Sequence, residues 1–213
     1  MGSLFRYIKY FSILGTLVVL TGFDLIDNHP AFHDYRDYIL KPSSVLSING
    51  ETNVNSFCCS SQQKFPKGRV GYEWGKGNGK LNFKNTQLKI NVQSLDCGAN
   101  AINKDLQKTL QAESFPYITI ELKEALNTDG GNSIKKNQWV EFLAKTEITL
   151  CCVTKEVTIP VVIRKSADNR FQIIGSTILQ FRDFELEPPT VMMGLIKVKE
   201  TLDISFDLDA VLI

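Results

Sequence analysis

The five cysteines are the residues of this 213-residue chain whose types and spacing most directly suggest chemistry. They occur as Cys58-Cys59, Cys97 and Cys151-Cys152, and neither pair has the C-x-x-C spacing that is typical of zinc or redox sites. Adjacent cysteines rarely bond to each other, because the small ring strains the peptide between them. We therefore expect bridges between distant cysteines, and the odd number leaves at least one thiol free or paired between chains.

The most favourable bridge joins the first cysteine pair to Cys97. Phe57 and Cys59 share one face of a predicted strand, whereas Cys58 points the other way. Cys97 follows the strand predicted at residues 88–92 and precedes a predicted helix. We expect Cys59 or Cys58 to bridge Cys97, which would fasten the opening segment to the start of the helix. In the chain-entropy model, closing a loop of about 38 residues stabilises a fold by roughly 3–4 kcal/mol.

Histidine-dependent chemistry is confined to the amino-terminal part of the chain, where His29 and His33 are the only two histidines. Their i, i+4 spacing on a helix that begins at Pro30 could chelate a metal ion, but no third ligand has a suitable spacing. We interpret both histidines as solvated side chains. The sequence therefore predicts no metal site and no Ser/His/Asp set.

The remaining candidate motifs favour structural interpretations. The glycine-rich stretch from Gly68 to Lys80 lacks the spacing of a phosphate-binding loop, and the residues after it look like a strand rather than a helix. We interpret it as a hairpin loop whose basic residues lie in solvent: Arg69, Lys76 and Lys80. Glu185 and Glu187 lie two residues apart at a predicted strand end, which does not indicate an acid/base pair. We therefore expect no enzymatic activity and no cofactor.

Composition and charge place the chain among ordinary folded domains. Hydrophobic residues make up 43% and charged residues 22% of the sequence, which excludes a disordered tail or a fibrous repeat. There are 24 Lys and Arg against 23 Asp and Glu, so the net charge is +1. This balance predicts no electrostatic attraction to nucleic acid.

Residues 1–22 have the pattern of a signal peptide. Arg6 and Lys9 precede an apolar run from Phe11 to Leu20, which has the length of a signal core and is too short to span a membrane. We expect a cleaved signal peptide, with an uncleaved membrane anchor as the alternative. The protein would then be periplasmic or secreted, in an oxidising compartment where disulfides persist.

Residues 23–42 are expected to form a separate lead with a short helix, on which Phe32, Tyr35 and Ile39 share one face. The main domain is expected to span residues 43–213, where apolar and polar residues alternate with a period of two. This period is typical of strands with one apolar and one solvated face, and many such strands indicate an antiparallel barrel or sandwich. The alternating stretches are Leu88–Val92, Ile118–Leu122, Val140–Leu150, Val157–Ile163, Phe171–Phe181 and Leu202–Leu208.

One stretch has the period of a helix instead. Ile102, Leu106 and Leu110 recur every four residues, Asn100 can cap the helix start, and Pro116 prevents its continuation. Within the strands, Pro160 requires an edge or a bulge, and Gly175 indicates a bend. The predicted fold class is therefore all-β with one short helix.

Four segments together resemble the YceI family of secreted, lipocalin-like lipid-binding proteins. They are INGETNVNSFCC at residues 48–59, the strand, helix and Phe-Pro-Tyr of residues 92–122, CVTKEVTIPV at residues 152–161, and the Pro-Pro-x-x-Met-x-Gly motif with the final strand at residues 184–208. The similarity extends over about residues 43–213. In the third segment the family usually has a small pair before Val-Thr-Lys, where this chain has Cys151-Cys152.

The resemblance implies an eight-stranded antiparallel, lipocalin-like barrel with a long isoprenoid chain inside. A barrel of this size has room for packed side chains or for one slender ligand. Periodicity alone favours a filled interior, whereas the resemblance implies a hollow one. Two hypotheses stay open: a protein that carries or sequesters a polyisoprenoid or similar lipid without chemical change, and a structural or interaction barrel with a filled core.

The residues predicted to line the bore face inward from the alternating strands, and one of them, Met192, matches the methionine of the family motif. They are Ile90, Ile118, Ile120, Phe142, Ile148, Ile159, Phe181, Met192, Ile204 and Phe206. A membrane would be a partner only transiently or through an uncleaved amino-terminal segment. The sequence leaves the ligand's identity and the oligomeric state open.

Overall fold

The computed structural model describes residues 35–191 and 195–213, which are mostly β-strand with one α-helix. The strands are β1 (Tyr35–Leu40), β2 (Val45–Thr52), β3 (Ser56–Ser61), β4 (Gly68–Trp74), β5 (Lys80–Lys84), β6 (Gln87–Asn91), β7 (Leu95–Asp96), β8 (Tyr117–Asn127), β9 (Trp139–Leu150), β10 (Val153–Ala167), β11 (Arg170–Gln180), β12 (Thr190–Val191) and β13 (Ile196–Leu212). The helices are α1 (Asn100–Thr109) and the short 3₁₀ turns η1 (Val92–Ser94) and η2 (Phe181–Phe184).

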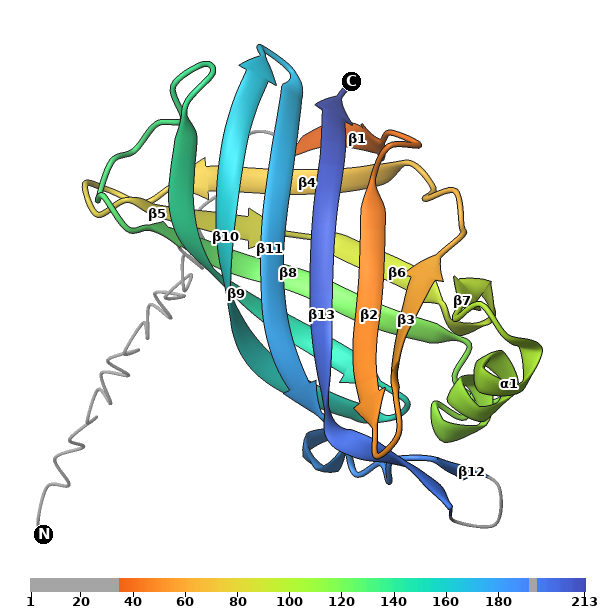
Figure 1. Ribbon diagram of the computed structural model, residues 1–213. Helices are drawn as coiled ribbons and strands as arrows, with labels where there is room; N and C mark the ends of the chain where they lie inside the picture. Colours follow the sequence, from red (N-terminus) through yellow and green to blue (C-terminus); the bar gives the residue numbers. More distant parts are fainter. Residues whose placement is uncertain (1–34, 192–194) are drawn as a thin grey trace, which may run out of the picture. The chain divides into compact units, whose positions relative to one another are not determined.

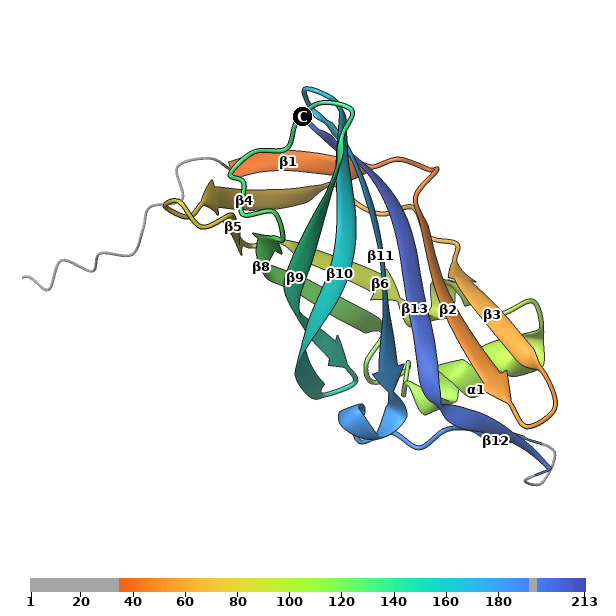
Figure 2. The same ribbon diagram turned by 60° about the vertical axis from the view of Figure 1, so that its left-hand side comes forward.

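Eight strands form a closed antiparallel ring (Figures 1 and 2). Their order is β1-β4-β5-β8-β9-β10-β11-β13, and pairing between β13 and β1 closes the ring. Strand β13 also pairs with β2, so that β2, β3 and β7 extend the wall on one side, while β6 extends it beside β8. The predicted eight-stranded, lipocalin-like barrel is therefore confirmed.

Prolines divide the first long strands of the barrel. Pro42 separates β1 from β2, and Pro66 separates β3 from β4. Since proline cannot donate a ladder hydrogen bond, both residues lie in the connections between strands, where the chain changes direction. As a result β1, β4 and β5 cross one end of the barrel at a steep angle to β2 and β13 (Figure 1). We call this end the β1 end, and the opposite end, with α1, η2 and the β12–β13 hairpin, the helix end.

The sheet begins earlier in the chain than the sequence predicted. Strand β1 lies within the predicted lead, and Tyr35 and Ile39 are strand residues, so the helix predicted there is wrong for both. The glycine-rich stretch is also mostly strand, because β4 begins at Gly68. Its Arg69 forms an ion pair with Asp37 of β1, with Nε and Oδ1 2.8 Å apart. The predicted signal peptide, His29 and His33 lie outside the described residues.

Alternation along the long strands separates a buried interior from an exposed outer surface. Phe142 and Ile148 of β9 are 1% and 3% exposed, whereas the intervening Leu143 is 41% exposed. Gly175 permits a close approach inside the barrel, since a Cβ atom there would lie 2.6 Å from Cζ of Phe206. A side chain at position 175 would therefore collide with Phe206, while the bend predicted there stays a prediction.

The ladder between β10 and β11 ends partway along the barrel. Its last pair toward the helix end is Val161 with Gly175, so Val153–Pro160 pair only with β9, and Ser176–Gln180 pair only with β13. Pro160 stands where β10 leaves β11, which satisfies the predicted requirement for an edge. We call this unpaired stretch the seam.

Helix α1 lies at the helix end of the barrel (Figure 1). Leu106 and Leu110 are buried, while Lys104 and Lys108 are exposed, as the predicted apolar face requires. The cap differs from the prediction, because Ala99 holds that position and makes no side-chain hydrogen bond. No helix in the described ranges is long and apolar enough to cross a membrane.

Candidate functional site

An apolar cavity of about 50 Å³ lies inside the barrel toward the helix end. Its walls come from opposite sides of the ring, from α1 and from the segment that includes η2. The lining residues are Leu46, Ile48, Ile90, Leu106, Leu110, Ile118, Ile120, Ile148, Leu150, Leu179, Gln180, Phe181, Phe184, Leu186, Leu202 and Ile204. Gln180 is the single polar residue of this set, and its Oε1 atom is buried without a hydrogen-bond partner.

Helix α1 closes one side of this cavity, and cysteines fasten it near both ends. At the start, a disulfide joins Cys97 to Cys59 of β3, which confirms the predicted bridge and selects Cys59 over Cys58. At the end, the Cys151 thiol donates a hydrogen bond to the Leu110 carbonyl, with Sγ and O 3.1 Å apart. The helix is therefore held on the barrel by more than its apolar face.

Asn103 secures the chain just before the helix. Its Oδ1 accepts a hydrogen bond from the Cys97 amide at 2.7 Å, and its Nδ2 donates to Asp96 Oδ1 at 3.1 Å. Asp96 also accepts from the Gly98 amide, and these hydrogen bonds lower the pKa of its carboxyl group. The side chain of Asn103 therefore holds the chain at the start of α1, where Asn100 was predicted to cap the helix.

The segment Phe181–Leu186 fills the cavity from the helix end, and we call it the plug. Phe181, Phe184 and Leu186 are 4%, 2% and 7% exposed, and η2 contacts β10, β11 and β13. The plug therefore lies against both edges of the seam. Its turn is fixed by Glu185 at a positive φ of 57° and by the Leu186 amide, which donates to the Phe181 carbonyl at 3.0 Å.

The structure brings most of the predicted lining residues together. Those that line the cavity are Ile90, Ile118, Ile120, Ile148, Phe181 and Ile204. Phe142, Ile159 and Phe206 belong to the same apolar core but do not line the cavity, and Phe142 packs near Trp74 with ring centroids 6.4 Å apart. Met192 lies outside the described residues. A binding role for any of these side chains stays a prediction.

Of the plug residues that line the cavity, Phe181 was predicted, whereas Phe184 and Leu186 were not. Phe184 and Leu186 lie between β11 and β12, in a 3₁₀ turn and the irregular chain that follows it. Such a segment has no period that identifies its buried face. The apolar spacing Phe181, Phe184 and Leu186 after a strand was the available signal.

Charged groups gather on the outside of the barrel. Hydrogen bonds from Arg69 and Lys67 lower the pKa of Asp37 to about 2, and Arg170 lowers the pKa of Asp209. Inside the described ranges, no three His, Cys, Asp or Glu side chains gather as a metal site would require. The interior is therefore suited to contact with apolar groups rather than to charge-dependent chemistry.

The remaining thiols lie outside the cavity or at its margin. Cys58 and Cys152 are exposed, and Cys151 is partly buried. Burial, and the neighbouring Cys152, raise the pKa of the Cys151 thiol, so this group is held in its protonated, hydrogen-bond-donating form.

A second, larger hollow of about 670 Å³ lies on the outer face of the sheet. Its lining comes mainly from β9, β10, β11, β13 and β2, and includes the outward Leu143, Pro160, Ser176 and Ser205 as well as the buried Phe142 and Val161. Leu143, Pro160 and Ser176 are exposed, so the hollow is open to solvent. It is poorly suited to enclose a ligand, because ligand sites commonly bury about 70–90% of the ligand surface.

Comparisons with solved structures identify the same fold. A polyisoprenoid-binding domain from Saccharophagus degradans has 12% identity and a TM-score of 0.60, over 83% of this chain and 98% of that one. Burkholderia cenocepacia BcnA has 17% identity and a TM-score of 0.57, over 78% and 95%. The Campylobacter jejuni YceI protein has 12% identity and a TM-score of 0.51, over 71% and 82%.

No curated protein matches the chain. At these low identities the likeness to solved structures concerns the fold alone. The family assignment comes instead from the sequence, which matches the YceI-like domain over residues 48–210. That match covers more than half of the chain and nearly all of the ring, and we conclude that this protein belongs to the YceI-like domain family.

Proposed function

We propose that this protein holds the chain of a polyisoprenoid, or of a similar long apolar lipid, inside the barrel and releases it chemically unchanged. The observation that carries the proposal is the cavity, whose lining is apolar except for Gln180. Each CH₂ group that a ligand buried there would contribute about 0.8 kcal/mol. The polyisoprenoid-binding domain of Saccharophagus degradans, which has the same fold, supports this ligand class.

Binding requires the cavity to enlarge. Its free volume of about 50 Å³ is well below the roughly 150 Å³ of an engineered cavity that accepts benzene. The plug is the part best suited to move, because it is a short segment beside the seam, where no β-ladder joins β10 to β11. Displacing Phe181, Phe184 and Leu186 would enlarge the apolar space without breaking a strand pair, because these residues lie outside the strands.

The small free volume also favours the second candidate, a structural barrel with a filled core. In that case the plug would be a permanent part of the core, and the protein would act through its outer surface. The two candidates differ in one measurable property, which is whether a long apolar chain enters the barrel.

Export is part of the proposal. Residues 1–22 have the pattern of a signal peptide, and a disulfide between Cys59 and Cys97 is typical of proteins in oxidising compartments. We infer a periplasmic or secreted protein. Fractionation of the native host, with amino-terminal sequencing of the recovered protein, tests this location.

Native mass spectrometry of protein purified from its own host tests the ligand proposal. We expect a bound species whose mass, after solvent extraction, matches an intact isoprenoid lipid. Incubation of the extracted protein with a polyprenol should restore a complex of one lipid per chain. Bare protein in both preparations would contradict the carrier function.

A further inference from the structure

The helix end of the barrel exposes apolar side chains at its tips. The most exposed large apolar residues in the described ranges are Leu195, Ile178 and Val54, at 72%, 66% and 65%. Val54 lies in the β2–β3 turn, Leu195 precedes β13, and Ile178 stands on β11 beside the seam. Single exposed apolar residues are ordinary, but the β2–β3 turn, the start of β13 and the last part of β11 all lie at the helix end of the barrel (Figure 1).

Two of these tips are held in a fixed arrangement by Asn53. Its Nδ2 donates to the Leu195 carbonyl at 2.9 Å, and its Oδ1 accepts from the Lys197 amide at 2.9 Å. The Asn53 amide donates to the Lys197 carbonyl at 3.1 Å. Within the same turn, Thr52 Oγ1 accepts from the Val54 amide at 3.1 Å. The exposure of Val54 and Leu195 is therefore built into the fold.

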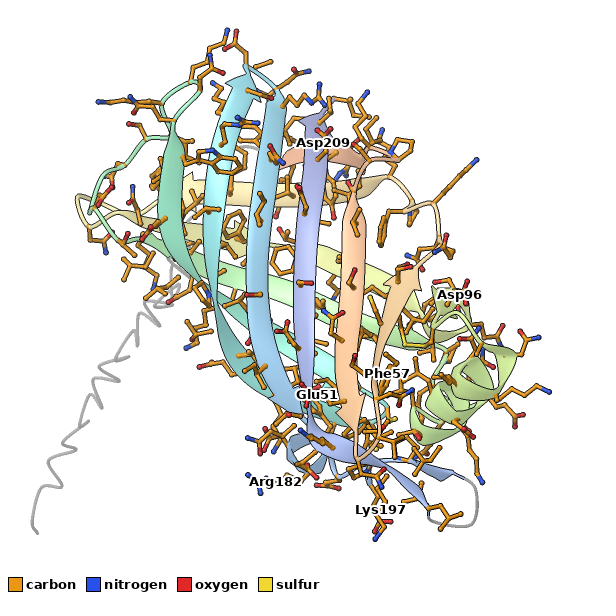
Figure 3. The ribbon with its side chains drawn as sticks, in the orientation of Figure 1. Glu51, Phe57, Asp96, Arg182, Lys197 and Asp209 are labelled. Carbon is orange, nitrogen blue, oxygen red and sulfur yellow. A yellow bond between two sulfur atoms is a disulfide. The ribbon has the colours of Figure 1, made fainter. Side chains whose placement is uncertain are left out.

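Charges around the tips are mixed in sign. Lys199 forms an ion pair with Glu51, and Figure 3 places Glu51, Arg182 and Lys197 at this end. The acidic Glu185 of the plug follows Arg182 by three residues in the sequence. Such a surface has no strong preference for anionic lipids, so its affinity would come from apolar contact.

We propose that this end docks on a lipid bilayer, with Val54 and Leu195 inserted among the lipids and the seam facing the membrane. Apolar side chains on convex loops, surrounded by polar groups, suit shallow insertion into a bilayer surface. A stable protein interface usually buries about 1,200 Å² or more, whereas the exposed apolar groups of the two turns are the single residues Val54 and Leu195. The inference rests on the proposed function, since it identifies where a lipid would enter.

Hydrogen–deuterium exchange of the full chain with phosphatidylcholine vesicles tests the docking. We expect vesicles to slow exchange in the turn at residues 53–55 and around Leu195 by about tenfold, since insertion removes these groups from water. Exchange near Val45, at the other end of β2, should not change. The double variant Val54→Asp/Leu195→Asp should lose the protection, whereas Val45→Asp should retain it.

Val45 is the control, because it is a half-exposed valine at the opposite end of β2, the strand that leads into the turn with Val54. Vesicles that leave the tip amides unchanged, or a loss of protection in Val45→Asp, would overturn the proposal. Thermal melts show whether each variant is folded. If the double aspartate variant does not fold, Val54→Ser/Leu195→Ser replaces it in the exchange experiment.

Delivery of a polyprenol in ethanol separates this proposal from the carrier function. The double aspartate variant should still bind polyprenol delivered in this way, because its cavity is intact. Protected tips together with no polyprenol uptake would support docking and refute the carrier. Polyprenol uptake by a protein with unprotected tips would support the carrier and refute docking.

Discussion

At the β1 end each strand of the ring has hydrogen-bonded neighbours on both sides, whereas at the helix end β10 and β11 separate beyond Val161 and Gly175. At the β1 end, main-chain hydrogen bonds between neighbouring strands hold the ring together. The helix end is closed by α1, the plug, a disulfide and a thiol hydrogen bond. Segments held by side chains open at lower free energy than paired strands, so ligand-dependent movement is expected at the helix end.

Placing a charge on the apolar face of α1 should have the largest effect. Leu106 is 7% exposed and lines the cavity. Leu106→Asp removes apolar contacts and buries a carboxyl group, so we expect a loss of about 5 kcal/mol or more in the free energy of unfolding. Lys108→Asp, on the exposed face, is the control and should change it by less than about 0.5 kcal/mol. Equal denaturation midpoints for the two variants would contradict the placement of α1.

Truncating one phenylalanine in each region compares the regions directly. Phe142 of β9 and Phe184 of the plug are 1% and 2% exposed. Replacing either with alanine should cost about 3–5 kcal/mol. Only Phe184→Ala should also speed polyprenol uptake, because it weakens the plug. Stopped-flow uptake with a fluorescent isoprenoid measures the difference, and equal acceleration in both variants would exclude the plug as the gate.

Removing the disulfide tests how firmly α1 is fastened. Cys59→Ala/Cys97→Ala removes a bridge across a sequence separation of 38, which is worth about 3–4 kcal/mol in the chain-entropy model. Cys58→Ala is the control and should be nearly silent, because Cys58 is exposed and free. Denaturant unfolding with exchange measurements should show faster opening of α1 and little change in β1 and β4. Uniform acceleration would mean that the two ends are not independent.

Acid should weaken the β1 end slightly and in a defined pH range. The pKa of Asp37 is lowered to about 2 by Arg69 and Lys67. Because the folded state has the lower pKa, the contribution is present above about pH 4 and is lost as pH falls toward 2. Asp37→Asn should therefore lower the melting temperature at pH 6 but not at pH 2. The effect is small because the pair is exposed, and an equal loss at both pH values would exclude the ion pair as its cause.

Much of the fold follows from local patterns in the sequence. Alternation identified the long strands, and the four-residue spacing of Ile102, Leu106 and Leu110 identified α1. The predicted bridge from the first cysteine pair to Cys97 is also confirmed; the sequence left Cys58 and Cys59 as alternatives, and the structure selects Cys59.

The features that distinguish the two ends could not be predicted in this way. Strand β1 is recognisable only from its pairing with distant strands, as in Tyr35 with Gly71 of β4 and Tyr38 with Leu212 of β13. The seam is the absence of a ladder between two strands that each alternate normally. The plug has no period at all, so Phe184 and Leu186 were left out of the candidate site.

The carrier function is tested most directly by Ile120→Trp, a substitution that would fill the cavity from its wall. Ile120 lines the cavity and pairs with Leu88 and Ile148 on the neighbouring strands. We expect wild-type protein from its own host to yield an isoprenoid on extraction. Ile120→Trp should yield none while keeping its melting temperature, because the indole occupies the space of the ligand. A wild-type protein that never takes up an isoprenoid, with an Ile120→Trp variant that is destabilised by about 1–3 kcal/mol, would show that the core is filled and contradict the carrier function.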